Sequence, residues 1–177
     1  DSRRGGLRSR RRASRFRALR PSPCAFARER ATIAVMDDLG SLILDLVRIP
    51  SVTGSERALA DLLEQRLAGG PAGRDHDLRR LGDTLVLLPR APIAGRPLLL
   101  LAGHIDTVPR DGAPEPAWDG GCIVGRGACD MKAGVAVLLA LAEGLRAEDG
   151  FARRAFVFYA GEEGPAVANG LGAALEA

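Results

Sequence analysis

Two short apolar runs place the strongest constraint on how this chain of 177 residues can fold. Residues 98–101 are four consecutive leucines, and residues 156–159 read Phe-Val-Phe-Tyr. Unbroken apolar runs of this length are typical of strands that are covered on both faces. Imidazole or carboxylate side chains follow shortly after each run, and the ends of buried strands are where α/β proteins keep their ligands and catalysts.

Segments with helical periodicity lie between the predicted strands. The spacing of leucine, isoleucine and valine predicts a first helix over residues 37–48 and an apolar helix over residues 131–146. Thr53 and Glu56 form a capping-box pattern, which predicts the start of another helix. The Gly-Gly-Pro sequence at 69–71 is expected to end that helix.

Turn residues and apolar runs predict the strands. A Gly82-Asp83 turn between residues 77–81 and 84–88 indicates a hairpin, and residues 98–102 and 155–160 are expected to be buried strands. Residues 109–130, rich in Gly, Pro and Asp, are expected to form a long functional loop. The alternation of strands with helices, including a last helix within residues 165–177, predicts an α/β fold.

The charge of the chain is unevenly distributed. Residues 1–35 contain eleven arginines and two acids, whereas residues 36–177 carry six more acidic than basic side chains. The arginine-rich head shows no apolar period, so we expect a disordered extension. It could be a nucleic-acid-binding arm, an organelle transit peptide, or sequence translated upstream of a start at Met36. We favour the last, because Met36 immediately precedes the first predicted helix, and we expect no nucleic-acid partner.

The cysteines and the hydropathy pattern bound the environment of the chain. The three cysteines, Cys24, Cys122 and Cys129, lack CxxC spacing, which favours free thiols in a reducing compartment such as the cytoplasm. No segment approaches the roughly eighteen consecutive apolar residues of a membrane-spanning helix, so we expect no membrane partner.

His104 and Asp106 are the first candidate site residues. Two residues apart on an extended segment, their side chains point to the same face. A histidine ligand needs a partner that fixes its tautomer and orientation, and a nearby carboxylate supplies one. The alternative is that His104 is an ordinary core histidine. The only other histidine, His76, lies in a polar run and is expected to be solvated.

Three further carboxylates complete the candidate set. Asp130 follows Gly125 and Gly127, which permit close backbone approach, but it also precedes a predicted helix and could simply be its N-cap. Glu162 and Glu163 follow the second apolar run. One could bind metal while the other activates a water, as metal-assisted hydrolysis requires; the alternative is a solvated pair of loop glutamates.

The ordered motifs HIDTVP (104–109), GRGACDMKAG (125–134) and GEEG (161–164) resemble those of the M20 family of metallopeptidases and deacylases. Trp118 and Gly120 fit the same pattern, and the resemblance covers residues 36–177. It implies a zinc-peptidase-like, three-layer catalytic domain with a mixed central sheet, incomplete at its C-terminus.

The resemblance also implies roles by position. His104 would bind one metal, Asp106 would orient it, Asp130 would bridge two metals, Glu162 would be the general base and acid, and Glu163 would bind the other metal. The cofactor would be Zn²⁺, two ions per complete site, with Co²⁺ as a possible substitute. The peptide bond after Asp130 is expected to be cis, as it often is in the family.

The implied substrate is a small N-acyl amino acid. The ending Ala-Asn-Gly-Leu-Gly at 168–172 is most similar to members that hydrolyse N-succinyl-LL-2,6-diaminopimelate. Deacetylation of acetylornithine, carboxypeptidase activity and a non-catalytic truncated product are the alternatives.

The length of the chain limits what it should do by itself. The chain ends fourteen residues after Glu163, before the remaining ligands and the dimerisation domain of the family. We therefore expect three of five direct metal ligands, weak zinc binding, no measurable turnover and a last element without packing partners. The longer parent enzyme is expected to be a homodimer.

Overall fold

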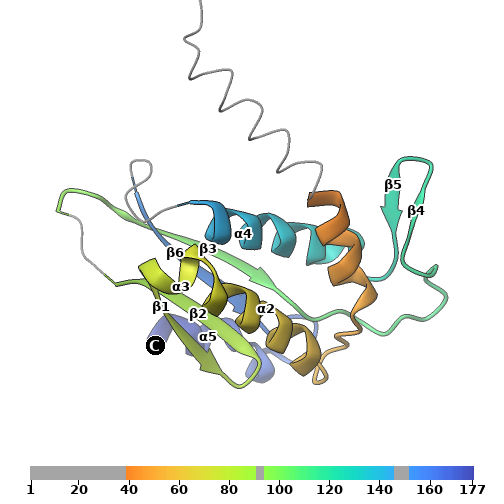
Figure 1. Cartoon of the computed structure of the whole chain (residues 1–177). Helices are drawn as coiled ribbons and strands as arrows, with labels where there is room; N and C mark the ends of the chain where they lie inside the picture. The colour runs from red at the N-terminus through yellow and green to blue at the C-terminus, as the bar shows by residue number, and fades with distance from the viewer. Residues whose placement is uncertain (1–38, 91–93, 146–151) are drawn as a thin grey trace, which may run out of the picture.

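The computed structural model describes residues 39–90, 94–145 and 152–177 (Figure 1). The predicted extension over residues 1–35 lies outside them. A mixed sheet of four strands in the order β1-β2-β6-β3 forms the centre of the fold. Its strands are β1 (His76–Leu81), β2 (Thr84–Pro89), β3 (Leu98–His104) and β6 (Arg153–Tyr159). β1, β2 and β6 pair antiparallel, whereas β3 and β6 are parallel, so the predicted α/β class and mixed sheet are confirmed.

Helices cover both faces of this sheet (Figure 1). On one face lie a helix over residues 39–48, α2 (Arg57–Gly69), α3 (Pro71–Asp75) and α4 (Ala133–Gly144). On the other lies α5 (Gly170–Glu176), which follows the short turn η2 (Ala166–Ala168). Alternation along β2 separates the two cores, because Leu85 and Leu87 pack with α2 and α4 whereas Val86 packs against Ala174 of α5.

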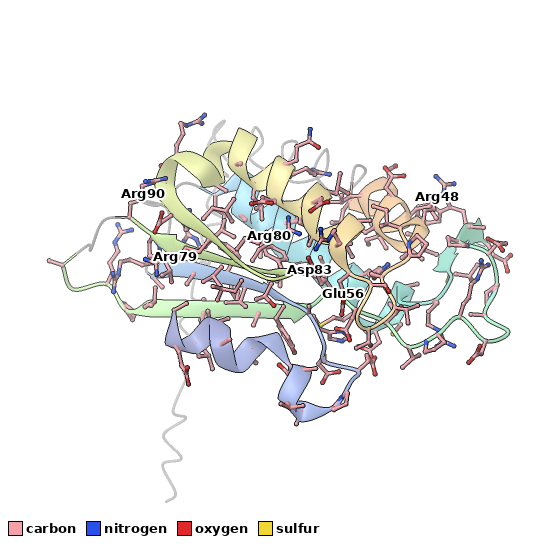
Figure 2. The ribbon with its side chains drawn as sticks, turned by 90° about the horizontal axis from the view of Figure 1, so that it is seen from below. Arg48, Glu56, Arg79, Arg80, Asp83 and Arg90 are labelled. Carbon is pink, nitrogen blue, oxygen red and sulfur yellow. The ribbon has the colours of Figure 1, made fainter. Side chains whose placement is uncertain are left out.

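Polar contacts tie the helices to the sheet and to each other. Arg66 of α2 makes a two-pronged ion pair with Glu143 of α4, at 2.9 and 2.8 Å. Arg80 of β1 donates to Asp61 and Glu64 of α2 and to Asp83 of the hairpin turn. Figure 2 shows Arg80 and Asp83 close together. These three carboxylates raise the pKa of Arg80. The cluster therefore fixes the hairpin against α2.

Two helix boundaries differ from the prediction. The helix predicted from the capping-box pattern is confirmed as α2, but its cap is not formed. Glu56 precedes α2 without a side-chain cap, and Thr53 donates its hydroxyl to Asp106 instead. The predicted helix over 131–146 begins only at Ala133, because Asp130 and Met131 have non-helical dihedral angles within the turn η1 (Ala128–Lys132). Arg146 lies outside the described residues.

The environment of β3 is another correction. We expected residues 98–102 to be covered on both faces, yet Leu98, Leu99 and Leu100 are 50%, 44% and 40% exposed. The reason is that β3 forms an edge of the described sheet, and α5 packs against β1, β2 and β6 instead. An apolar run therefore identified the strand but not its position in the sheet.

The other predicted elements are present, with two differences from the prediction. The hairpin of β1 and β2 and the last helix are confirmed, although α5 does have packing partners in β2 and β6. The predicted loop over residues 109–130 contains a small hairpin, β4 (Ala117–Asp119) and β5 (Cys122–Val124), which projects from the body (Figure 1). Within the described residues, no helix is long and apolar enough to cross a membrane.

Candidate metal centre

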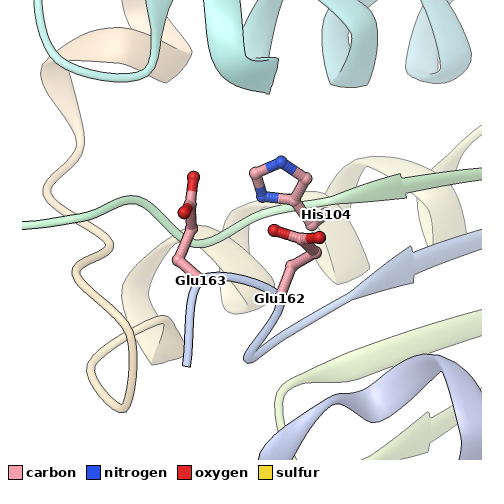
Figure 3. Close-up of side chains that lie close together, drawn as sticks. All are labelled: His104, Glu162 and Glu163. Carbon is pink, nitrogen blue, oxygen red and sulfur yellow. The ribbon is translucent and has the colours of Figure 1, made fainter. Parts of the chain in front are cut away.

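The topology brings His104, Glu162 and Glu163 to one edge of the sheet. β3 and β6 are parallel neighbours, and His104 at the end of β3 pairs with Tyr159 at the end of β6. The chain then turns at Gly161, whose φ of 76° suits glycine, and presents the two glutamates beside the imidazole. Figure 3 shows the three side chains facing one another. One ligand atom from each of them lies within 4.8 Å of the others.

Hydrogen bonds orient the His104 ring. Nδ1 lies 3.1 Å from the main-chain carbonyl oxygen of Asp106 and 3.5 Å from its carboxylate Oδ1. Because a carbonyl oxygen can only accept, the closer contact assigns the proton to Nδ1. Nε2 is thereby left with its lone pair toward Oδ1 of Asp130, 3.0 Å away. Two atoms that both carry lone pairs face each other there, an arrangement that requires a proton or a cation.

The Asp106 carboxylate connects three separate segments. It is fully buried. Its Oδ1 accepts from the backbone N–H of Glu162 at 3.0 Å, and its Oδ2 accepts from the backbone N–H of Glu163 at 2.9 Å. The hydroxyl of Thr53 donates to Oδ2 at 2.9 Å. Asp106 therefore holds the loop of both glutamates as well as the His104 ring.

Asp130 reaches the centre from the turn η1. The peptide bond between Asp130 and Met131 is cis, as expected from the resemblance. The Asp130 side chain is 75% exposed, and its partner among the described side chains is His104. The N-cap alternative does not describe this structure, because Lys132 occupies the N-cap position of α4. The Asp130 carboxylate is thus available to a ligand.

Lys132 fixes the turn that carries Asp130. It is the single lysine of the sequence and is almost fully buried. Its Nζ donates to the carbonyl oxygens of Leu46 at 3.1 Å and Ile49 at 2.5 Å, at the end of the helix over 39–48. A cation is favourable at a helix C-terminus, although burial lowers the pKa of Lys132 to about 8.

The Tyr159 ring also lies near the imidazole of His104. Its ring centroid lies 6.1 Å from that of His104. Burial raises the pKa of Tyr159, and the negative charges of Glu162, Asp106 and Asp130 raise it further. The phenol is therefore neutral at physiological pH and retains its proton for hydrogen bonding.

Comparison with known proteins shows which family the chain resembles. Residues 100–177 match the peptidase family M20/M25/M40. The chain is 36% identical over 137 residues to the succinyl-diaminopimelate desuccinylase of Halorhodospira halophila, and 37% identical over 127 residues to a putative succinyl-diaminopimelate desuccinylase of Mycobacterium tuberculosis. Residues 100–177 belong to the M20 peptidase family. These alignments cover 71% and 72% of this chain but only 35% and 34% of the relatives. The chain therefore spans about a third of their length.

Solved structures show the same M20 fold. A tripeptidase from Staphylococcus aureus superposes with a TM-score of 0.56 at 25% identity, over 71% of this chain and 36% of that one. A dinuclear metal-binding peptidase of the M20 family from Bacillus subtilis gives a TM-score of 0.53 at 17% identity, over 80% and 40% of the two chains. The fold described here is therefore part of an M20 catalytic domain.

The five predicted site residues all lie within this one region of the chain. Sequence reasoning missed two residues that support the region. Thr53 is one of them: its capping-box pattern predicts a helix cap, whereas its hydroxyl bonds to Asp106. Lys132 is the other, and no local sequence pattern signals its contact with the first helix. The prediction that His76 is solvated was wrong: His76 is buried, with Nε2 at 3.0 Å from the carbonyl oxygen of Arg154.

Proposed function

We propose that this chain provides part of the active site of a metal-dependent amide hydrolase. Its substrate is an N-acyl amino acid, and the relatives' names favour N-succinyl-LL-2,6-diaminopimelate, cleaved to succinate and LL-2,6-diaminopimelate. The observation that carries the proposal is the convergence of His104, Glu162 and Glu163, with Asp130 against Nε2 of His104. Following the family, we place the reaction in the cytoplasm and expect a homodimeric whole protein.

The donor set fits zinc. One imidazole nitrogen and carboxylate oxygens are ligands that Zn²⁺ accepts, and Co²⁺ accepts the same set. A cation beside Nε2 of His104 and Oδ1 of Asp130 would also relieve the contact between their lone pairs at 3.0 Å. In this assignment His104 and Glu163 would each hold one of two zinc ions, and Asp130 would bridge them.

The residues of the chain then have distinct tasks in the reaction. Bound zinc would supply Lewis-acid polarisation of the amide carbonyl. The Glu162 carboxylate accepts a proton from the attacking water and passes it to the nitrogen of the leaving amine. Asp106 keeps Glu162 in place through the backbone N–H and holds the proton on Nδ1 of His104 through its carbonyl oxygen. Tyr159 supplies a neutral hydroxyl at the border of the site.

A chimera tests the activity. Residues 39–177 would replace the matching third of the Halorhodospira halophila desuccinylase, and succinate release from N-succinyl-LL-2,6-diaminopimelate would be measured with zinc present. We expect the chimera to turn over, and we expect Glu162→Ala to lower the turnover rate at least about a hundredfold while the zinc content stays unchanged. The control Glu176→Ala, at the end of α5, should be fully active.

Two outcomes would reject the proposal. One is a folded, zinc-loaded chimera that hydrolyses none of N-succinyl-LL-2,6-diaminopimelate, N-acetylornithine and a tripeptide. The other is activity that survives Glu162→Ala. If the chimera hydrolyses only N-acetylornithine or the tripeptide, the proposed amide hydrolase activity stands and the proposed substrate is replaced.

A further inference from the structure

A second cavity adjoins the candidate metal centre. It has a volume of about 270 Å³ and lies between residues 47–52 and the segment that follows Asp106. A neighbouring cavity is lined by Asp130 and Glu163. Val108 and Arg126 line both cavities. The two cavities are therefore adjacent, and Arg126 borders both of them.

The second cavity is basic. Its charged lining residues are Arg48, Arg110, Arg126, Lys132 and a single acid, Glu115. Arg110 is paired with Glu115 at 2.6 Å, and the Lys132 ammonium is bonded to main-chain carbonyl oxygens. Arg48 lies 3.5 Å from Asp45 and points outward, as Figure 2 shows. Arg110, Arg48 and Lys132 thus each have polar partners within the chain.

Arg126 carries one buried N–H group that lacks an acceptor within the described part of the chain. Its Nε is buried and has no partner there. Its backbone position is fixed, because Gly125 and Gly127 on either side have φ angles of 138° and 83°. A Cβ at either glycine would lie 2.7 Å from Val47 or Thr107. The loop therefore holds a buried guanidinium N–H in a place where an acceptor must come from outside.

We infer that Arg126 binds a carboxylate group of the substrate. A guanidinium recognises a carboxylate through two parallel charge-assisted hydrogen bonds, and such a pair would satisfy the buried Nε. This inference rests on the proposed function and narrows its substrate to acyl amino acids with a carboxylate beyond the scissile amide. That carboxylate belongs either to the acyl chain, as in a succinyl group, or to the amino acid.

Titration of the chain with the two product types tests the inference. Sodium succinate and LL-2,6-diaminopimelate would be added separately to the ¹⁵N-labelled chain, with and without zinc, and backbone shifts followed by NMR. We expect one of them to shift the amide signals of Gly125 and Gly127, and the active probe identifies which carboxylate binds. Arg126→Gln should weaken that binding at least about tenfold, with Arg126→Lys in between. The matched control Arg48→Gln should change it less than about twofold.

The outcomes separate this inference from the proposed function. Equal binding by wild type and folded Arg126→Gln, or binding of neither probe, would overturn the carboxylate site. Zinc binding is measured in the same samples, and Arg126→Gln should leave it unchanged. If zinc does not bind but the Arg126-dependent shifts persist, the metal-hydrolase proposal fails and the carboxylate site remains.

Discussion

At the scale of single residues, Asp106 has the largest number of distinct partners in the centre. Its carboxylate accepts two backbone N–H groups and the Thr53 hydroxyl, while its carbonyl oxygen faces Nδ1 of His104. A carboxylate can accept at both oxygens, and no neutral side chain of the same size can. The spacing of His104 and Asp106 predicted the orientation of the imidazole but not the link to the glutamate loop.

Asp106→Asn should therefore weaken metal binding. The amide nitrogen would face a backbone N–H of Glu162 or Glu163, so one donor would oppose another and the loop would shift. We expect zinc affinity to fall about tenfold to a hundredfold, as for other residues that support metal ligands. Isothermal titration would measure it, with Asp77→Asn on the exposed part of β1 as the control. An unchanged affinity would exclude a positioning role for Asp106.

Thr53→Val tests the hydroxyl contact alone. The valine keeps the shape of threonine but leaves Oδ2 of Asp106 without this donor, so we expect a loss of about 1–2 kcal/mol in the free energy of unfolding. Urea denaturation would measure the loss. Thr53→Ser keeps the hydroxyl and should lose less. A larger loss in Thr53→Ser than in Thr53→Val would contradict this account and point to the methyl group, which lies toward Gly164.

At the scale of elements, local patterns predicted where the strands and helices lie better than they predicted which distant residues contact them. The Gly82-Asp83 turn is sufficient to specify the β1–β2 hairpin, because its geometry is local. Thr53 was misread because its partner Asp106 is 53 residues away, and a short motif carries no information about such a contact. His76 was misread for the same reason, since the carbonyl group it contacts belongs to Arg154 on another strand.

Lys132 joins two elements, and its removal should destabilise both. Lys132→Met keeps the aliphatic stem but leaves the carbonyl groups of Leu46 and Ile49 without their donor. We expect a loss of about 2–4 kcal/mol at pH 7 in the free energy of unfolding. Denaturant unfolding measures this loss, and a value below about 0.5 kcal/mol would show that the two contacts contribute little.

The same lysine should give a pH dependence of stability. Burial lowers the pKa of Lys132 from 10.5 to about 8. Between these two values the unfolded chain binds more protons than the folded chain, so this contribution to stability increases as the pH rises from 8 to 10.5. The difference in unfolding free energy between wild type and Lys132→Met should increase over this window. A flat difference would mean that the ammonium group is not desolvated.

At the scale of the whole molecule, β3 leaves an apolar edge on the described sheet. The position of a strand within a sheet depends on all its partners, which is why four consecutive leucines predicted burial that the structure does not show. Unpaired edge strands with apolar side chains favour association between chains. We expect the isolated chain to associate as its concentration rises.

Leu100→Lys should suppress this association. A charge on the edge strand opposes pairing with a second chain, so sedimentation velocity should show a smaller average mass at equal concentration. The matched control is Val137→Lys on α4, where Val137 is 42% exposed, close to the 40% of Leu100. Equal effects of the two substitutions would point to net charge, and not to the edge of β3, as the cause.

Metal binding by the chain itself tests the central claim most directly. Titration with Co²⁺, followed by its visible absorption, should show saturable binding that His104→Ala abolishes and Glu163→Gln weakens at least about tenfold. Glu176→Gln, on α5 away from the centre, should bind as wild type does. Absence of saturable binding, or a spectrum that is unchanged in His104→Ala, would contradict a metal centre at the ends of β3 and β6.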